Sequence, residues 1–512
     1  MTPELLDRLR SDLESAAFTT DRVRALLGED ADAARLRGVF APAHHMLDQR
    51  PPGAAAALIR LFLLGVVGDD DLIAQALPTL GAEGATALGL LARDPSGGLR
   101  AGLSLNPVSL PDGPADTPEH WWILSDLDDQ LRRAPARPDH VMGVGGATRS
   151  LIAMLPPGPV SRSLDLGTGC GIVALHLARR GPVIATDVSQ RALDLARANA
   201  RLNRIDGIEF RRGDLFAPVA GERFDLVASN PPFVVTPRGD DEAERFSYRD
   251  GGLVGDALVQ RVVSDAPAYL TDGGELICLA NWESHWGSDG LARVAEWIST
   301  HEHPLAAWVI ERDRVSPTRY AETWARDGGA RPGDPEFERL LGTWLADFRA
   351  REIVALGLGS IRLRRLVAGS SAVIRTEAAE GPYSTAPGAA LSAAFDAAIE
   401  ASAQGDDAIL DRRWLRDDDV SEERVHTPGN DAPSAITLVA SRGIARRVTA
   451  DTLLAAAVGA SDGDLTLRQI ADALADLLEA PAPEVAAALV AGVRELVWLG
   501  VLRPAPADRL DD

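Results

Sequence analysis

The sequence contains no lysine: all 52 of its basic residues are arginine. Together with the abundance of alanine, this composition is typical of a GC-rich genome, and we give it no functional meaning. Acidic residues outnumber basic ones by 75 to 52, so the formal net charge is −23. Such a balance gives no general attraction to phosphate backbones or anionic membranes, although it still permits a local basic patch.

Cysteine is also scarce. Cys170 and Cys278 are the only two, and neither has a partner at the spacing of a metal site or a disulfide. We therefore expect reduced thiols and no metal. The N-terminus lacks the basic and apolar regions of a signal peptide, and the apolar stretch at 54–67, about 14 residues long, is too short to span a bilayer. These absences predict a cytoplasmic protein without membrane contact.

With 512 residues, the chain is expected to form two to four domains. Residues 1–137 read as helices followed by a hairpin, either a winged-helix-like substrate domain or a small helical cap. Residues 138–376 alternate short apolar runs with helices, which predicts an α/β domain with a parallel sheet covered on both faces. Residues 377–405 read as a linker with a helix. Residues 406–512 read as a second helical unit, either winged-helix-like or an interaction domain.

Within the α/β domain, the apolar runs and amphipathic patterns place individual elements. We expect a helical insertion at 315–350, strands at 163–166, 183–186, 208–211, 224–229, 275–280, 306–310 and 362–374, and helices at 172–180, 189–202, 253–266 and 291–300.

A glycine-rich turn follows the first of these strands. Asp165 stands two residues ahead of Gly167, and Thr168, Gly169 and Gly171 complete the turn. Glycines at a strand-to-helix turn let the backbone approach a ligand. A dinucleotide fingerprint would place its last glycine one position later. The acid suits a cationic ligand such as S-adenosylmethionine, which carries a sulfonium and an ammonium group, better than a diphosphate.

Acids also follow the next two strands. Asp187 ends the second strand, where a carboxylate commonly accepts from ribose hydroxyls. Asp214 follows the third strand, where it can accept from an adenine amino group while Leu215 and Phe216 pack against the ring. Three acids at successive strand ends around one glycine-rich turn predict a nucleoside-type cofactor more strongly than any one of them.

These residues carry a family resemblance. Residues 161–283 resemble the class I S-adenosylmethionine-dependent methyltransferases. The resemblance implies a Rossmann-like seven-stranded sheet whose last strand is antiparallel. It also implies that the loop from Gly167 to Gly171 holds the methionine part of the cofactor, Asp187 the ribose and Asp214 the adenine.

The fourth strand leads into Asn230, Pro231, Pro232 and Phe233. An amide or exocyclic amine is a poor nucleophile because its lone pair is delocalised, so a catalyst must accept its N–H hydrogens and align the nitrogen. Asn230 can accept through its side-chain oxygen and Pro231 through its carbonyl, because the following proline favours extended backbone. Phe233 offers a flat face for a planar substrate. The motif therefore predicts methyl transfer to a planar nitrogen.

The same motif resembles that of methyltransferases acting on glutamine amides, adenine N6 or guanine N2. The Asp-Gly-Gly segment within 248–256 is similar to release-factor glutamine methyltransferases. Phe233 in place of tyrosine, a Gly-rich segment at 143–148 and the C-terminal unit depart from that group, and the phenylalanine is more reminiscent of RNA amine methyltransferases.

Three functions follow as hypotheses: a protein glutamine methyltransferase, a ribosomal or transfer RNA methyltransferase, and a cofactor-binding regulator without catalysis. The macromolecular substrate would thus be a protein such as a translation factor, or RNA. A continuous arginine groove near Phe233 would favour RNA, and an acidic or apolar cleft would favour protein.

Overall fold

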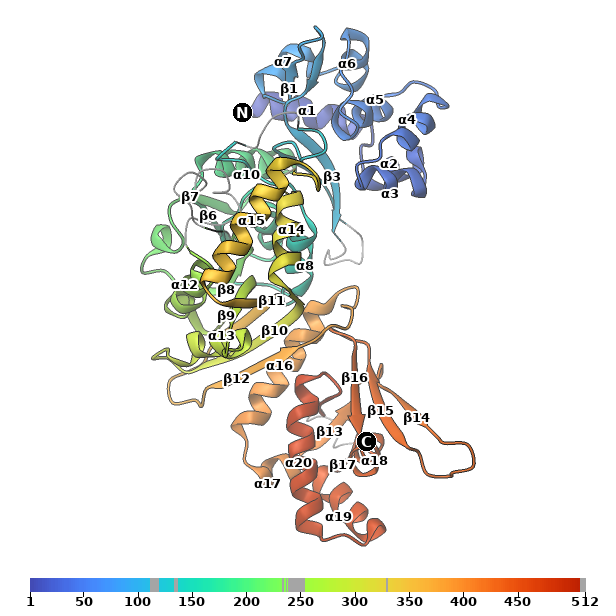
Figure 1. Ribbon diagram of the computed structural model, residues 1–512, viewed down its shortest axis with the longest axis vertical. Coiled ribbons are helices and arrows are strands. Elements are labelled where there is room, and N and C mark those ends of the chain that lie inside the picture. Colours follow the sequence, from blue (N-terminus) through green and yellow to red (C-terminus); the bar gives the residue numbers. More distant parts are fainter. Residues whose placement is uncertain are drawn as a thin grey trace.

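The computed structural model of the chain describes residues 1–110, 119–132, 137–232, 234–235, 237, 254–327 and 330–506. Three units follow one another along the longest axis: N-terminal helices with two hairpins, a central sheet covered by helices, and a C-terminal unit of helices and short strands (Figure 1). The order of the units along the axis is their order in the sequence.

A mixed sheet of eight strands forms the centre, in the order β12-β10-β11-β9-β8-β5-β6-β7. β11 runs antiparallel to both of its neighbours, whereas the other pairs are parallel. The seven strands from β5 to β11 confirm the class I arrangement with its antiparallel last strand, and β12 adds an eighth strand at the edge. The strands are β5 (Ser163–Leu166), β6 (Val183–Asp187), β7 (Ile208–Arg212), β8 (Phe224–Ser229), β9 (Leu270–His285), β10 (Leu305–Val315), β11 (Ile353–Arg365) and β12 (Val373–Ala378).

One expected strand is two strands. The apolar run at 362–374 was predicted to be continuous, but β11 ends at Arg365 and β12 begins at Val373. That prediction was wrong because apolar character continues through Leu366 and Val367, although the chain turns at Gly369, whose φ is 88°. Composition alone does not separate a strand from an apolar turn.

Helices cover both faces of the sheet, and alternation along each strand divides the core between them. In β8, Leu226 and Ala228 face the helices α8, α9, α10 and α16, whereas Val227 faces α12 and α13. The continuous burial of β5 and β8 thus reflects two apolar layers, as the sequence pattern predicted. The covering helices are α8 (Gly146–Met154), α9 (Ile172–Ala178), α10 (Gln190–Leu202), α12 (Ala257–Asp265), α13 (Gly290–Ser299) and α16 (Pro387–Ala403), with 3-10 turns η2 (Ala217–Val219) and η3 (Ala266–Tyr269).

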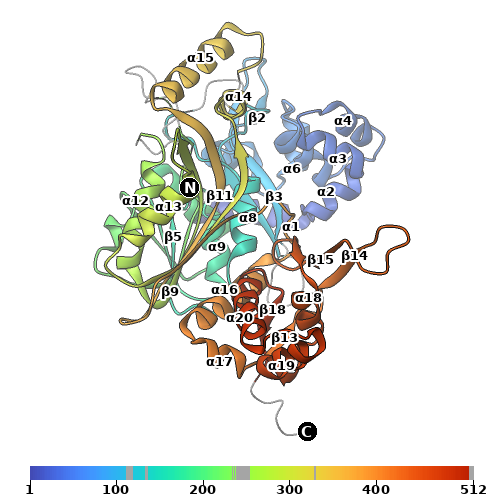
Figure 2. The same cartoon turned by 60° about the horizontal axis from the view of Figure 1, so that its bottom comes forward.

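The expected helical insertion lies between β10 and β11. It consists of α14 (Pro317–Asp327) and α15 (Pro335–Ala350), and the two helices pack against each other at the far end of the long strands (Figure 2). β9 and β11 are long because they stay paired from Glu275–Arg364 to His285–Ile353, well past the end of β8. The insertion is therefore placed beside the loop that follows β8.

The N-terminal unit is helical with two hairpins. Gly68 bridges Leu99 in antiparallel fashion, so a helix, a bridge, two helices and the hairpin β1–β2 follow one another, an order that fits the winged-helix alternative. A second hairpin, β3–β4, leads to the central domain. The elements are α1 (Pro3–Ser15), α2 (Thr20–Leu27), α3 (Glu29–Leu36), α4 (Ala41–Asp48), α5 (Ala54–Leu58), the π-helical η1 (Ile59–Leu63), α6 (Asp70–Ala76), α7 (Gly81–Ala87), β1 (Leu91–Arg93), β2 (Leu99–Ala101), β3 (Ser104–Leu110) and β4 (Glu119–Ser125).

The side chains of Asn199 on α10 and of Asn203, directly after that helix, attach this second hairpin to the central domain. Asn199 accepts from the N–H of Leu124 at 2.8 Å and donates to its carbonyl at 2.9 Å, and Asn203 makes the same pair of bonds with Trp122, each at 2.9 Å. The outer edge of β4 is thus paired by side-chain amides instead of by another strand.

The C-terminal unit combines helices with short strands, most of which the sequence pattern did not indicate. It adds two three-stranded sheets, β17-β13-β18 and β14-β15-β16. These strands escaped prediction because they are short and much of their surface is exposed; every residue of β14 is exposed. Thr466 caps the expected helix at 467–478 with a full capping box. The elements are α17 (Asp406–Leu410), β13 (Arg413–Arg416), β14 (Ser421–Val425), β15 (Ala435–Ala440), β16 (Arg446–Ala450), α18 (Thr452–Gly459), β17 (Asp462–Thr466), α19 (Leu467–Leu478), α20 (Ala482–Trp498) and β18 (Leu502–Pro504).

Aromatic packing joins the C-terminal unit to the sheet. Trp308 of β10, Phe395 of α16 and Trp498 of α20 pack together, with the two indole rings 5.4 Å apart, edge to face. The helix within the predicted linker is therefore buried against the sheet. In the part of the chain that the structure describes, no helix combines the length and apolarity needed to cross a membrane.

Candidate active site

The glycine-rich turn connects β5 to α9 at the edge where the parallel strands end. Gly167, Gly169 and Gly171 have φ angles of 79°, 54° and 88°, a region that side chains disfavour. A Cβ on Gly167 or Gly169 would meet no atom within 4 Å, whereas one on Gly171 would lie 2.8 Å from the Cβ of Ala196. The first two glycines thus leave an open cradle for a ligand, and the third lets the turn pack against α10.

Asp165 lies beneath this turn. Its carboxylate is 2% exposed, and its Oδ2 accepts from the Thr168 hydroxyl at 2.6 Å and from the Ala174 N–H at 2.9 Å. Burial raises the pKa of Asp165 to about 7, against the two hydrogen bonds that lower it. In this structure Asp165 therefore shapes the turn and the start of α9.

Asp187 ends β6 and faces the same turn. One carboxylate oxygen accepts from the N–H of Gly169 at 3.0 Å, and the other accepts from the N–H of Ser189 at 2.8 Å. Burial raises its pKa, and these backbone donors oppose that rise. A carboxylate oxygen can accept more than one hydrogen, so both oxygens keep capacity for ligand hydroxyls.

The third acid lies farther out. Asp214 is exposed and pairs with Arg261 of α12, with Oδ2 and Nη1 3.0 Å apart. Leu215, at a φ of 44°, is half-buried beside it. Phe216 does not join them, because its ring is 2% exposed and stacks on Tyr269 at 4.5 Å. Phe216 is therefore a core residue, and Leu215 is the apolar neighbour of Asp214.

Asn230 directly follows β8. Its Nδ2 donates to the hydroxyl of Thr148 on α8 at 3.1 Å. Its Oδ1 is buried, and among the described residues no donor reaches it. Pro231 is buried and Pro232 half-buried, whereas Phe233 lies outside the described residues. Thr148 therefore fixes the orientation of the Asn230 amide and leaves its acceptor unpaired.

The sequence did not reveal two residues of this site. Thr148 is 82 positions away from Asn230 and shares no motif with it. Asn199 is fully buried on α10 and donates to the carbonyl of Cys170 in the glycine-rich turn at 2.8 Å. A polar residue on the apolar face of a predicted helix was the available signal for Asn199. The Asp-Gly-Gly segment at 250–252 lies outside the described residues.

Two protein families match parts of the chain. Residues 142–294 match the family described as methyltransferase small domain, and residues 15–102 match a domain of unknown function (DUF7059). The first match covers β5 to β9, with the glycine-rich turn, Asp187, Asp214 and Asn230.

Curated proteins are similar over the same part of the chain. The release factor glutamine methyltransferase of Xylella fastidiosa is 39% identical over 130 residues, which is 24% of this chain and 47% of that protein. The ribosomal protein uL3 glutamine methyltransferase of Bradyrhizobium diazoefficiens is 39% identical over 149 residues, 27% of this chain and 46% of that protein. The release factor glutamine methyltransferase of Yersinia pestis is 42% identical over 140 residues, 26% of this chain and 50% of that protein. The chain thus spans about half the length of the curated relatives it matches.

Among solved structures, the ribosomal protein L11 methylase of Lactobacillus delbrueckii subsp. bulgaricus is 17% identical, with a TM-score of 0.25 over 44% of this chain and 81% of that one. The N-methyltransferase NodS of Bradyrhizobium japonicum, in complex with S-adenosyl-L-homocysteine, is 18% identical, with a TM-score of 0.24 over 43% of this chain and 85% of that one.

Proposed function

We propose that this chain, whose residues 142–294 form a class I methyltransferase domain with an Asn-Pro-Pro-Phe motif, transfers a methyl group to a planar nitrogen of a macromolecule. The favoured substrate is the side-chain amide of a protein glutamine. The similarity to release factor and ribosomal protein glutamine methyltransferases supports this choice.

The buried side-chain oxygen of Asn230, which has no donor within the described part of the chain, carries the proposal. A buried acceptor without a donor lowers the stability of the fold by about 1–3 kcal/mol. Such an acceptor therefore indicates a site where a ligand donates the missing hydrogen bond. Because Thr148 holds the amide nitrogen, the oxygen is presented to an incoming N–H. The Pro231 carbonyl is the proposed second acceptor. Two such acceptors would orient an NH2 group and offset the poor nucleophilicity of its nitrogen.

The open glycine-rich turn fits S-adenosylmethionine as the cofactor. Gly167 and Gly169 leave space over the turn, and Asp187 presents oxygens toward it. We assign the ribose hydroxyls to Asp187, and the adenine to Asp214 with Leu215. When bound, S-adenosylmethionine would supply the methyl group of its sulfonium: the carbon–sulfur bond would break with a neutral thioether as leaving group, and the substrate nitrogen would form the new bond to carbon and give a proton to solvent.

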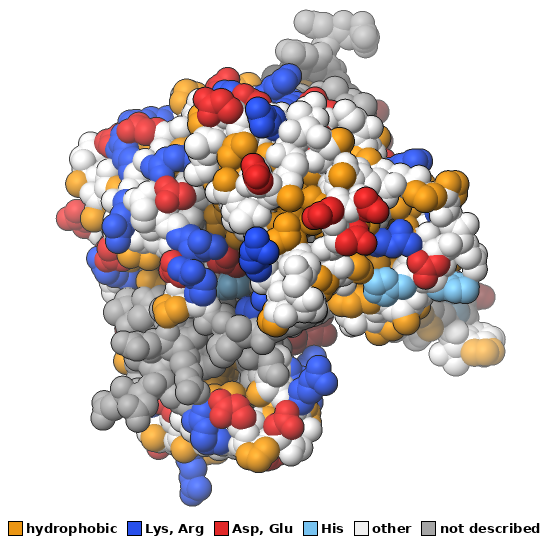
Figure 3. Space-filling view, turned by 90° about the horizontal axis from the view of Figure 1, so that it is seen from above, with side chains coloured by type: hydrophobic (Ala, Val, Ile, Leu, Met, Phe, Trp, Pro, Cys, Tyr) orange, Lys and Arg blue, Asp and Glu red, His pale blue; other side chains and the backbone are white. Residues whose placement is uncertain are grey.

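A cleft beside α8 lacks an excess of basic charge among its described lining residues, so it gives no support to the RNA alternative. It measures about 470 Å³ and lies between the N-terminal unit and the start of α8. Its charged lining residues are of both signs. Figure 3 shows acidic and basic side chains interspersed over the described surface that is seen from above. RNA binding requires basic charge that follows the phosphate backbone. The charged lining residues are Asp21, Arg24, Asp32, Arg35, Asp128 and Arg149.

The test is methyl labelling of a lysate that lacks this protein, with purified enzyme and methyl-labelled S-adenosylmethionine. We expect label that protease removes and ribonuclease leaves, and methylated glutamine after peptide mass spectrometry. Asn230→Ala is the matched control and should transfer little label. Label removed by ribonuclease would place the substrate among RNA amines. No label from folded protein that binds the cofactor would favour the regulator hypothesis.

A further inference from the structure

The helical insertion anchors the chain just after the Asn-Pro-Pro motif. Val234 and Val235 are 5% and 0% exposed, and they pack in a core cluster formed mainly by α14, α15 and the start of β11. The backbone N–H of Val235 donates to the phenol oxygen of Tyr320 on α14 at 2.9 Å. A residue 85 positions away along the chain thus fixes the backbone five residues after Asn230.

The phenol oxygen of Tyr320 is itself fixed from the sheet. The side-chain nitrogen of Asn281 donates to it at 2.9 Å, and Asn281 is only 2% exposed. β8 ends at Ser229, which is opposite Cys278, whereas β9 continues to His285. Asn281 therefore lies on the part of β9 that extends past the end of β8, beside the segment that follows the motif.

Aromatic packing holds the ring of Tyr320 in place. The rings of Trp324, Trp344 and Phe348 lie 5.9, 5.8 and 6.1 Å from it. Tyr320 is 1% exposed. The position of its oxygen is thus set by α14, α15 and β9 together, since its ring has little room to turn.

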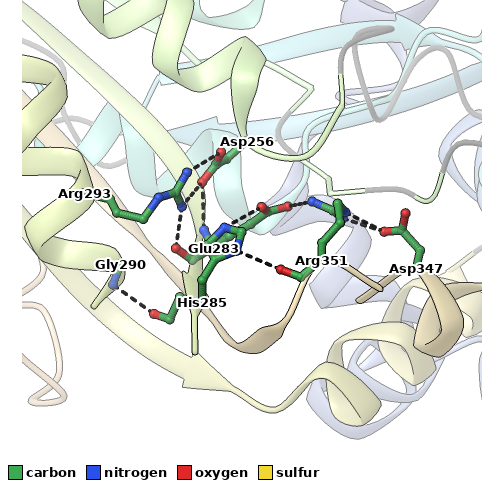
Figure 4. A network of polar contacts seen from close by, with 8 residues as sticks. Asp256, Glu283, His285, Gly290, Arg293, Asp347 and Arg351 are labelled. Atoms are coloured by element: carbon green, nitrogen blue, oxygen red, sulfur yellow. Dashed lines mark hydrogen bonds and ion pairs between the residues drawn. The ribbon is translucent and has the colours of Figure 1, made fainter. Parts of the chain in front are cut away.

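Charged contacts fasten the base of the insertion to the sheet (Figure 4). Arg351, directly after α15, forms ion pairs with Glu283 of β9 and with Asp347, and its carbonyl lies 2.9 Å from Nδ1 of His285. Asp256, at the start of α12, accepts from the N–H of Glu283 at 2.9 Å. The insertion and the helix that resumes after the motif are therefore tied to the same end of β9.

We propose that Tyr320 is a positioning residue for methyl transfer, which rests on the proposed function. The motif is held from two sides by elements distant in sequence: Thr148 on α8 binds the Asn230 side chain, and Tyr320 on α14 binds the Val235 backbone. These two anchors together set the positions of the proposed acceptors, the Asn230 side-chain oxygen and the Pro231 carbonyl. Loss of the second anchor leaves the cofactor site intact and misplaces the acceptors.

The experiment compares Tyr320→Phe with the wild-type chain and with Tyr383→Phe. The first variant keeps the ring and removes the oxygen that accepts from Val235. The second removes the phenol oxygen of Tyr383, which packs in a different core cluster and whose ring lies 4.3 Å from the Arg312 guanidinium. We expect Tyr320→Phe to lower kcat at least tenfold and to leave the KM for S-adenosylmethionine within twofold, because small misplacements of reacting groups cost large factors in rate. Amide hydrogen exchange at Val235 should rise in this variant alone.

An unchanged kcat, or exchange at Val235 that rises equally in both variants, would overturn the positioning role. A rise in the KM for S-adenosylmethionine that matches the loss of kcat would also overturn it, because the effect would then act through the cofactor site. If the wild-type chain methylates neither protein nor RNA, the proposed function fails, whereas hydrogen exchange still decides whether Tyr320 anchors Val235.

Discussion

At the scale of single residues, the side-chain amide of Asn230 is oriented by one hydroxyl group. The Asn230 side-chain nitrogen donates to Thr148, and the buried side-chain oxygen has no donor among the residues that the structure describes. Asn230→Ala should therefore lower kcat roughly 100-fold while the affinity for S-adenosylmethionine stays within about twofold, since in the proposed function the lost hydrogen bond is the one to the reacting nitrogen. Steady-state kinetics and calorimetry measure the two quantities.

Asp187→Ala serves as the contrasting variant, because it removes oxygens that face the glycine-rich turn. It should weaken cofactor binding in calorimetry. Turnover by Asn230→Ala comparable to wild type would remove the assigned role of Asn230, and unchanged affinity in Asp187→Ala would contradict the ribose assignment.

Asp165 makes stability depend on pH. Burial raises its folded pKa to about 7 from an ordinary value near 3.8. Between these values the folded chain holds a proton that the unfolded chain has lost, so the free energy of unfolding falls as pH rises and levels off above about 7. Thermal unfolding of Asp165→Asn should lack this component. We expect the stability difference between variant and wild type to shift in favour of the variant from pH 4 to 7.

Equal pH profiles of the two proteins would show that Asp165 titrates normally. The pH dependence of stability is the readout, and not the stability difference at a single pH, because asparagine also changes the hydrogen bonds to Thr168 and Ala174.

The residues of the site were predictable to the extent that they lie in local motifs. The turn at 167–171 and Asp187 come together at the end of the sheet because strand ends of a parallel sheet share one edge. Thr148 and Tyr320 were not predictable as partners of the motif, since hydroxyl groups at 82 and 85 positions of separation leave no spacing pattern.

At the scale of elements, the prediction succeeded where burial was continuous and failed where it was not. β5 and β8 are buried on both faces and were located within a residue. The strands of the C-terminal unit carry few buried residues, so their pattern resembles that of loops. Helix α19 was predicted with its cap because a capping box is a local signal.

Helix α20 is expected to depend on one aromatic contact with the sheet. Trp498 is 6% exposed and packs on Trp308 and Phe395. Trp498→Ala should lower the free energy of unfolding by roughly 3–5 kcal/mol, the usual cost of such a cavity. Denaturant unfolding followed by tryptophan fluorescence measures this change.

Glu495→Gln is the matched control on the same helix. Its ion pair with Arg375 is half-exposed on the glutamate side, so we expect a loss of less than about 1 kcal/mol. Equal losses in the two variants would mean that charge, and not aromatic packing, joins α20 to the sheet.

At the scale of the whole molecule, a side chain of the central domain links the β3–β4 hairpin of the N-terminal unit to the glycine-rich turn. Asn199 binds both Leu124 of β4 and the carbonyl of Cys170, whereas Asn203 binds β4 alone within the hairpin. Asn199→Ala should weaken binding of S-adenosylmethionine about tenfold although Asn199 lies outside the cradle. Asn203→Ala should leave that affinity within twofold.

Calorimetric titration of the two variants measures this difference, and both should show similarly reduced thermal stability because both loosen the hairpin. If both variants lose the same affinity for S-adenosylmethionine, the effect comes from general destabilisation. If neither loses affinity, the hairpin does not influence the cofactor turn.

Because Asn199 binds both the β3–β4 hairpin and the glycine-rich turn, binding events at these two places can affect each other's affinity. If a bound cofactor tightens the turn and with it the β3–β4 hairpin, then a partner that selects the tightened hairpin must raise cofactor affinity by the same factor. Binding at the hairpin and binding at the cofactor turn would then form one equilibrium, in which each ligand reports the presence of the other.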